Sequence, residues 1–104
     1  MSNVYVNPPR TVTQADSPVV IQVPASATAH QFAISALTAT AGTVAVSYKA
    51  AGSTVTVPLK DVNDAAVVCN IPAGTRQRVE GQLAEFTFTL AGLNGTIEIG
   101  LAGA

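Results

Sequence analysis

The segment EFTFTL, residues 85–90, decides the fold, because its apolar residues recur at every second position. Phe86, Phe88 and Leu90 alternate with polar side chains over the whole segment. A period of two is typical of a β-strand that turns one face to a core and the other to solvent. We therefore expect these three side chains to face the interior of a β-sheet protein.

The same alternation continues toward the C-terminus, over residues 97–101. Asn94 and Gly95 lie between the two segments, and both residues tolerate the positive φ angles of a tight hairpin turn. The sequence therefore predicts that residues 85–90 and 97–101 form an antiparallel hairpin.

A second hairpin is predicted further toward the N-terminus, between residues 43–48 and 54–59. Small and polar residues at 50–53 separate the two runs and indicate a turn. Pro58 lies in the second run and cannot donate a ladder hydrogen bond, so this run should lie at a sheet edge.

Three more apolar segments, at residues 19–23, 31–36 and 66–71, also read as strands, and no segment has a clear helical period. Roughly seven short strands at regular spacing are typical of an antiparallel β-sandwich or a small barrel. We expect an all-β fold, with jelly-roll and immunoglobulin-like connections both open.

Residues 1–17 differ from the rest of the chain, because Pro8 and Pro9 interrupt a stretch rich in Asn and Val. We predict an extended N-terminal arm here and a β-sandwich domain over residues 18–104. The arm either frays or lies on another subunit. Its expected contact residues are Val4, Tyr5, Val6 and Arg10.

The surface is expected to carry few charges, because only 11% of the residues are charged and the net charge is −1. Such a surface favours association over the monomeric state. The 5 Lys and Arg residues are spread along the chain and form no basic stripe for nucleic acid. No apolar run approaches the ~20 residues of a membrane span. Copies of the chain or another protein are thus the expected partners, and nucleic acid and membranes are not.

A cluster of three charges, Arg76, Arg78 and Glu80, stands out against this composition. On a strand the three side chains would share one face. This face is either solvated or a subunit contact, in which arginine pairs with carboxylates. We add Arg76 and Arg78 to the predicted interface.

No catalytic, cofactor or metal site is predicted. His30 has no nucleophile at a favourable spacing and is expected at a strand start, with a surface or interface hydrogen bond. Cys69, in an apolar run, is expected to be a small buried residue. Asp61, Asn63 and Asp64 resemble part of a calcium loop but lack its glycine and final glutamate, so they indicate a solvated turn. A weak ion site shared between subunits is the alternative.

The N-terminus lacks the basic start and apolar stretch of a signal peptide, and the single cysteine has no partner within the chain. Both features favour synthesis in a reducing cytoplasm.

The runs at residues 43–48 and 54–61, together with the ending from 86 to 99, give the chain a family likeness. Over residues 18–104 it resembles the small virion proteins of tailed bacteriophages, above all capsid decoration (cement) proteins. The likeness lies in the composition of the strands, which are short and rich in Ala, Thr and Val. It implies a homotrimer that binds the major capsid protein, is located in the virion and is made in the host bacterial cytoplasm.

The expected function is therefore that of a non-enzymatic structural protein that stabilises a phage shell through its arm and its oligomer contacts. One alternative is another virion component, such as a head fibre base, a neck part or a tail-associated module. A second is a module that binds carbohydrate or a host surface.

Overall fold

The computed structural model describes residues 5–24 and 26–103. This part of the chain folds into nine strands and no α-helix, with one 3-10 turn, η1 (Gln14–Asp16). The strands are β1 (Tyr5–Val12), β2 (Val19–Gln22), β3 (Ala29–Ala36), β4 (Thr43–Ala50), β5 (Thr56–Pro58), β6 (Val68–Asn70), β7 (Thr75–Glu80), β8 (Leu83–Ala91) and β9 (Ile97–Gly103).

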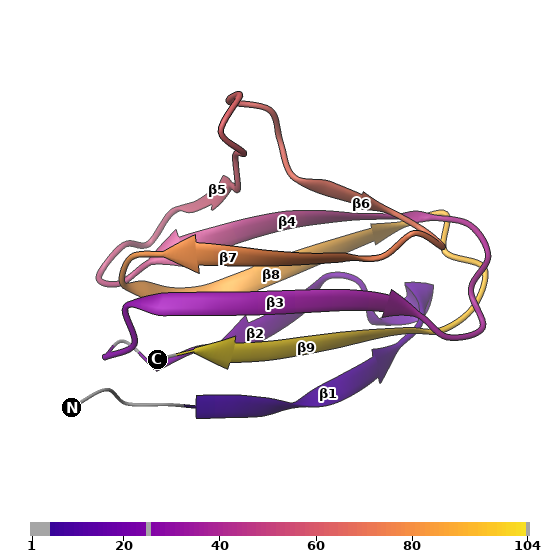
Figure 1. The fold of residues 1–104 in the computed structure, drawn as a ribbon, viewed down its shortest axis with the longest axis horizontal. Coiled ribbons are helices and arrows are strands. Elements are labelled where there is room, and N and C mark those ends of the chain that lie inside the picture. Colours follow the sequence, from indigo (N-terminus) through magenta and orange to yellow (C-terminus); the bar gives the residue numbers. More distant parts are fainter. Residues whose placement is uncertain (1–4, 25, 104) are drawn as a thin grey trace.

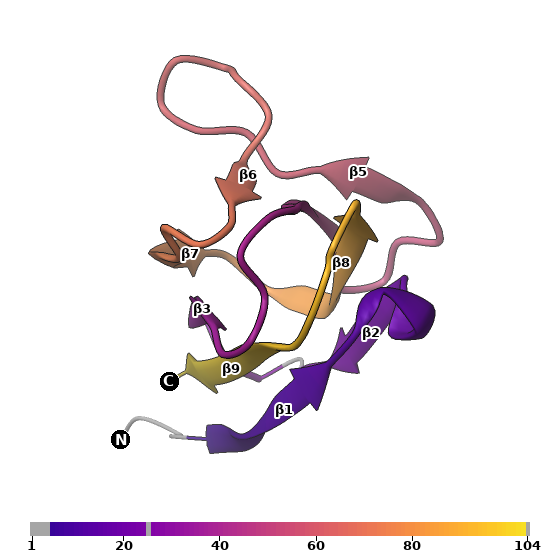
Figure 2. The same cartoon turned by 90° about the vertical axis from the view of Figure 1, so that its right-hand side faces the viewer.

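The strands form two antiparallel sheets that lie face to face (Figures 1 and 2). The first sheet has the order β1-β9-β3-β7. The second has the order β2-β8-β4-β5, and β6 pairs with β4 as well. The sheets do not close into a barrel. The prediction of an all-β antiparallel sandwich is confirmed, with more strands than expected.

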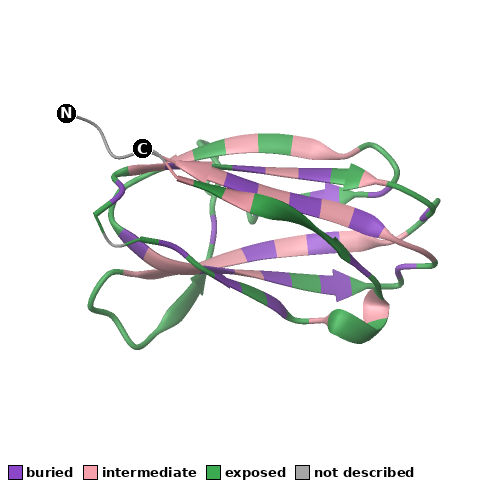
Figure 3. Cartoon of the chain, turned by 90° about the horizontal axis from the view of Figure 1, so that it is seen from below, coloured by how far each residue is buried: buried purple, intermediate pink, exposed green. Residues whose placement is uncertain are grey.

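The core lies between the two sheets, and it explains the alternation of the EFTFTL segment. Phe86 and Phe88 of β8 are completely buried. Phe32 of β3 reaches them from the other sheet, with ring centroids 5.8 Å from Phe86 and 5.7 Å from Phe88. Buried and exposed positions alternate along the strands (Figure 3). The predicted inward positions of this segment are confirmed.

The predicted hairpin of residues 43–48 and 54–59 is also confirmed. Strands β4 and β5 are antiparallel neighbours, with Tyr48 opposite Val57 and Ser47 opposite Pro58. Strand β5 is the edge of its sheet, as Pro58 requires.

The predicted hairpin of residues 85–90 and 97–101 is wrong, because β8 and β9 belong to different sheets. The loop between them crosses from one layer to the other. The side-chain Oδ1 of Asn94 accepts hydrogen bonds from the backbone N–H groups of Thr40 and Ala41, at 2.8 and 3.1 Å. Gly95 lies so close to the backbone of Ala39 that a Cβ would be 2.7 Å from its nitrogen. These two residues therefore fix a crossover against a neighbouring loop.

The division into an arm at residues 1–17 and a separate domain also needs correction. Residues 5–12 are extended, as expected, but they form β1 and pair with β9 from Tyr5 opposite Gly103 to Val12 opposite Ile97. Pro8 and Pro9 cause only an irregularity in this ladder, which an edge strand tolerates. Val12 is buried in the core, so the segment is part of the sandwich.

The residues after β1 are tied to the second sheet. The side chain of Gln14 donates a hydrogen bond to the carbonyl of Leu90 at 2.6 Å and accepts one from the N–H of Leu93 at 3.0 Å. Ser17 accepts a hydrogen bond from the N–H of Leu90 at 3.0 Å. The sandwich therefore includes the described residues from Tyr5 onward.

Two substitutions in β1 test this placement. Val12→Ala removes buried methyl groups and should lower the free energy of unfolding by roughly 2 kcal/mol. Val6→Ala alters a side chain that is 71% exposed on the same strand, and it should change stability by no more than about 0.5 kcal/mol. Urea unfolding at a low protein concentration measures both. Equal losses in the two variants would show that β1 is not held by the core.

Candidate functional site

The outer face of the first sheet has a floor of very small side chains. Ala33 of β3, and Gly100 and Ala102 of β9, point away from the core, because their neighbours along each strand are buried. These three residues add little side-chain height to the middle of the sheet, and Gln31, opposite Ala102, is the longer side chain beside them. The central hollow that results has a volume of about 270 Å³.

The two edge strands of this sheet supply the walls. Val6 and Pro9 of β1 line one side of the hollow, and Arg76 of β7 lines the other. Pro9 lies over Gly100, where an added Cβ would be 4.0 Å from its ring. The wall on β1 is apolar, and the wall on β7 is cationic.

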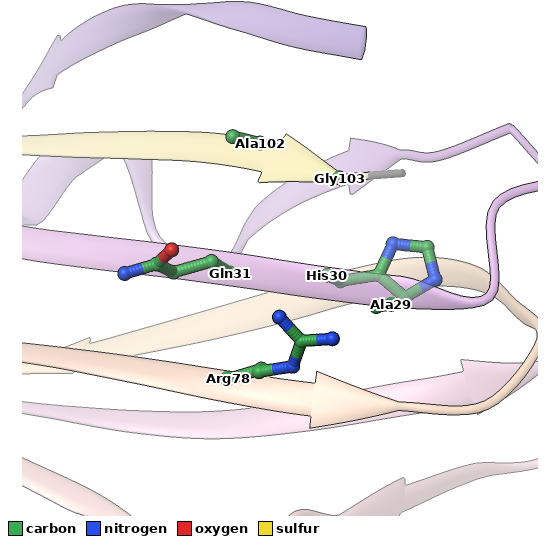
Figure 4. Close-up of a pocket in the computed structure, with 6 residues that line it drawn as sticks. All are labelled: Ala29, His30, Gln31, Arg78, Ala102 and Gly103. Carbon is green, nitrogen blue, oxygen red and sulfur yellow. The ribbon is translucent and has the colours of Figure 1, made fainter. Parts of the chain in front are cut away.

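Two further hollows extend this depression along β3. One of them shares Ala33 and Arg76 with the central hollow and continues toward Gly74. The other shares Gln31 and Ala102 with it and continues to Arg78. Figure 4 shows the Arg78 side chain rising from β7 toward β3 at this end. We call these three adjoining hollows together the sheet groove.

The charges of the groove come from β7. The Arg78 guanidinium lies 3.5 Å from the Glu80 carboxylate, and both side chains are largely exposed, so this ion pair is weak. Within the described residues Arg76 has no carboxylate within 4.0 Å. Arg76 is therefore an available cation in the wall of an apolar depression.

The structure brings three of the six predicted interface residues to this groove, namely Val6, Arg76 and Arg78. Arg10 points elsewhere, because its guanidinium donates to the carbonyl of Val20 at 3.5 Å, on the side of β2. Tyr5 turns toward His30. Val4 lies outside the described residues.

The prediction that His30 makes a surface or interface hydrogen bond is wrong. Its side chain is only 1% exposed, and its Nδ1 is hydrogen-bonded to the hydroxyl of Tyr5 of the same chain. Its ring also packs edge-on against Phe86, with centroids 5.8 Å apart. The sequence contained the signal for this position, because His30 is in phase with the buried residues Phe32 and Ile34.

Burial also determines the protonation of this pair. Desolvation lowers the pKa of His30, and the backbone carbonyls of Gly81 and Ala27 oppose this effect to a smaller extent. Burial also raises the pKa of the Tyr5 hydroxyl. The His30 Nε2 has no hydrogen-bond partner among the described residues. The neutral ring is therefore favoured, and the pair joins β1 to β3.

Cys69 is buried, as predicted, and burial raises the pKa of its thiol. The Asp61 carboxylate closes its own turn by accepting hydrogen bonds from the N–H groups of Asn63 and Ala65, at 2.8 and 3.0 Å. In residues 5–24 and 26–103, no three His, Cys, Asp or Glu side chains gather as for a metal ion. The same residues contain no helix long and apolar enough to span a membrane.

Comparisons with protein-family models, curated proteins and solved structures found no match to this chain.

The Tyr5–His30 contact predicts a sensitivity to acid. Because the pKa of His30 is lowered in the folded state, the unfolded chain binds this proton more readily. The free energy of unfolding should have its full value above about pH 6.5, the pKa of histidine in the unfolded chain. It should fall as the pH drops below that value. Urea unfolding between pH 7.5 and 5 measures this decline.

The matched variant is His30→Phe, which keeps an aromatic ring beside Tyr5 and Phe86. The chain has one histidine, so this variant removes the only side chain that ordinarily titrates between pH 5 and 7.5. Its stability should change much less over the same pH range. An unchanged pH slope would rule out His30 as the cause.

Proposed function

We propose that this protein is a non-enzymatic structural component that acts by associating with copies of itself and with a larger protein shell. The sheet groove is the observation that supports this function. It combines an exposed valine, a floor of Ala and Gly, and an available arginine on one face of a rigid sheet. An apolar depression with a polar rim is typical of protein–protein contact sites.

The rest of the surface supports the same proposal, because exposed apolar side chains occur in several places. Within residues 5–24 and 26–103, the large hydrophobic residues that are more than half exposed are Val6, Leu37, Val55 and Val62. Burial of one valine side chain contributes roughly 1.5 kcal/mol, whereas association costs at least about 4 kcal/mol of translational and rotational freedom. Several contacts must therefore act together, as they do in a shell of many copies.

Within this class, we propose a virion protein of a tailed bacteriophage, of the capsid decoration type. One support is the resemblance of the short, Ala-, Thr- and Val-rich strands to those of such proteins. The other is a β-sandwich whose strands expose few charges. Its connections would be jelly-roll-like or immunoglobulin-like. Such a protein would form homotrimers, bind the major capsid protein and be made in the host bacterial cytoplasm. The mechanism is passive, because each contact made only by the folded assembled state stabilises that state.

The contact with the shell would differ from that of a free arm. Residues 5–12 are already paired within their own sheet, so the outer face of that sheet is the available surface. A carbohydrate-binding role is less favoured, because stacking on sugars needs exposed aromatic rings. Phe32, Phe86 and Phe88 are completely buried.

Phage particles purified from cells that make the protein test the proposal. Quantitative mass spectrometry should find hundreds of copies in each particle for a shell decoration protein, and removal of the protein should lower the temperature at which the shell opens. About a dozen copies would indicate a neck or tail component instead. Absence from the particles, with shells of unchanged stability, would contradict the proposal.

A further inference from the structure

The loop between β5 and β6 is the most prominent projection of the molecule (Figures 1 and 2). Residues 61–66 are all exposed, and Val62 is 100% exposed. A fully exposed valine at the end of a projecting loop contributes no packing to its own chain. We call residues 60–66 the acidic loop, after Asp61 and Asp64 on either side of this valine.

The acidic loop is ordered without the help of Val62. A bridge between Lys60 and Ala66 closes its base, and the N–H of Asp61 donates to the carbonyl of Ala65 at 2.9 Å. The N–H of Asp64 donates to the carbonyl of Asp61 at 3.0 Å. A loop whose shape is already fixed loses little conformational entropy when it binds.

We propose that the acidic loop of one copy docks into the sheet groove of a second copy of the chain. This inference rests on the proposed function, and it names the partner and the contact. The apolar Val62 would lie on the floor of small side chains, and the Asp64 carboxylate would face Arg76.

The two surfaces carry groups of opposite charge beside an apolar centre. The central hollow, of about 270 Å³, lies over Ala33, Gly100 and Ala102, and Gln31 is also part of its lining. The loop has two carboxylates and, at its base, Lys60, whereas the groove wall has two guanidinium groups, of which Arg78 is paired with Glu80. The other, Arg76, has no ion-pair partner in the described chain, so it is free to bind a carboxylate of another copy.

The contact is heterologous, because the loop and the groove are different parts of the surface. A contact between two different surfaces produces a closed ring where the rotation permits, and an open chain of copies otherwise. Two grooves packed face to face, with the two-fold axis perpendicular to the strands, would place Arg76 and Arg78 of one copy against the same residues of the other. Like charges in direct opposition disfavour that arrangement.

Two single substitutions at exposed positions test the contact. Val62→Lys replaces the apolar side chain of the acidic loop with a cation, which offsets the negative charge of the neighbouring carboxylates. Arg76→Glu reverses the available cation of the groove. Each should raise the dissociation constant for self-association by at least about tenfold, a change of about 1.4 kcal/mol, in sedimentation velocity experiments.

Each variant has a matched control away from the contact. Val20→Lys makes the same change at a valine that is 42% exposed on β2, in the other sheet from the groove. Arg10→Glu makes the same reversal at an arginine that points away from the groove. Both controls should associate like the unaltered protein.

Mixing the two defective proteins gives the decisive measurement. The Val62→Lys protein keeps an intact groove, and the Arg76→Glu protein keeps an intact loop. The two should bind each other with one contact, although neither associates with itself. Addition of the unlabelled Arg76→Glu protein to ¹⁵N-labelled Val62→Lys protein should shift the amide signals of Ala33, Gly100 and Ala102, while the reverse labelling should shift those of residues 61–64.

The outcomes separate this inference from the proposed function. If both variants associate like the unaltered protein, or if the mixture shows no shifts, the loop does not dock into the groove. If the unaltered protein remains monomeric at all concentrations, the self-contact is also excluded. In either case the copy number in particles still decides the proposed function.

Discussion

The packing of Phe32 against Phe86 and Phe88 is the contact on which the structure depends. These rings come from β3 in one sheet and β8 in the other, and their centroids lie less than 6 Å apart across the core. The contact fixes which face of each sheet points inward. Because side chains alternate along a strand, it also fixes the residues that point outward. The outward position of Ala33 and Gly100, which lie in the groove floor, follows from this inward packing of the rings.

The sequence could predict features that depend on neighbours along the chain. The alternation around Phe86 correctly identified the core face of β8, and Pro58 correctly identified an edge strand. The sequence could not show which strands become partners. Asn94 and Gly95 formed a strong local turn signal, yet hydrogen bonds to Thr40 and Ala41 decided the path of the chain. Contacts between loops far apart in sequence leave no local pattern.

The candidate site was predictable only in part, for the same reason. Two separate sequence patterns predict Val6 and Arg76 as interface residues. Val6 belongs to an apolar segment, and Arg76 belongs to a charge cluster. They lie on opposite edges of one sheet because β9 and β3 pair between them. Gly100 and Ala102 were missed, because small residues on the outside of a strand carry no signal until the strand order is known. His30 was misjudged although its phase with Phe32 was visible.

The pairing of β1 with β9 has one more consequence, for the ends of the described chain. Tyr5 lies directly opposite Gly103 in the ladder, so these two residues are neighbours in space. A short linker could therefore join them without disturbing either sheet, and the chain could be reopened at an exposed turn such as that at Gly52. The order of the strands along the polypeptide is thus separable from their arrangement in space. A circular permutant should preserve the same sandwich and the same outer face.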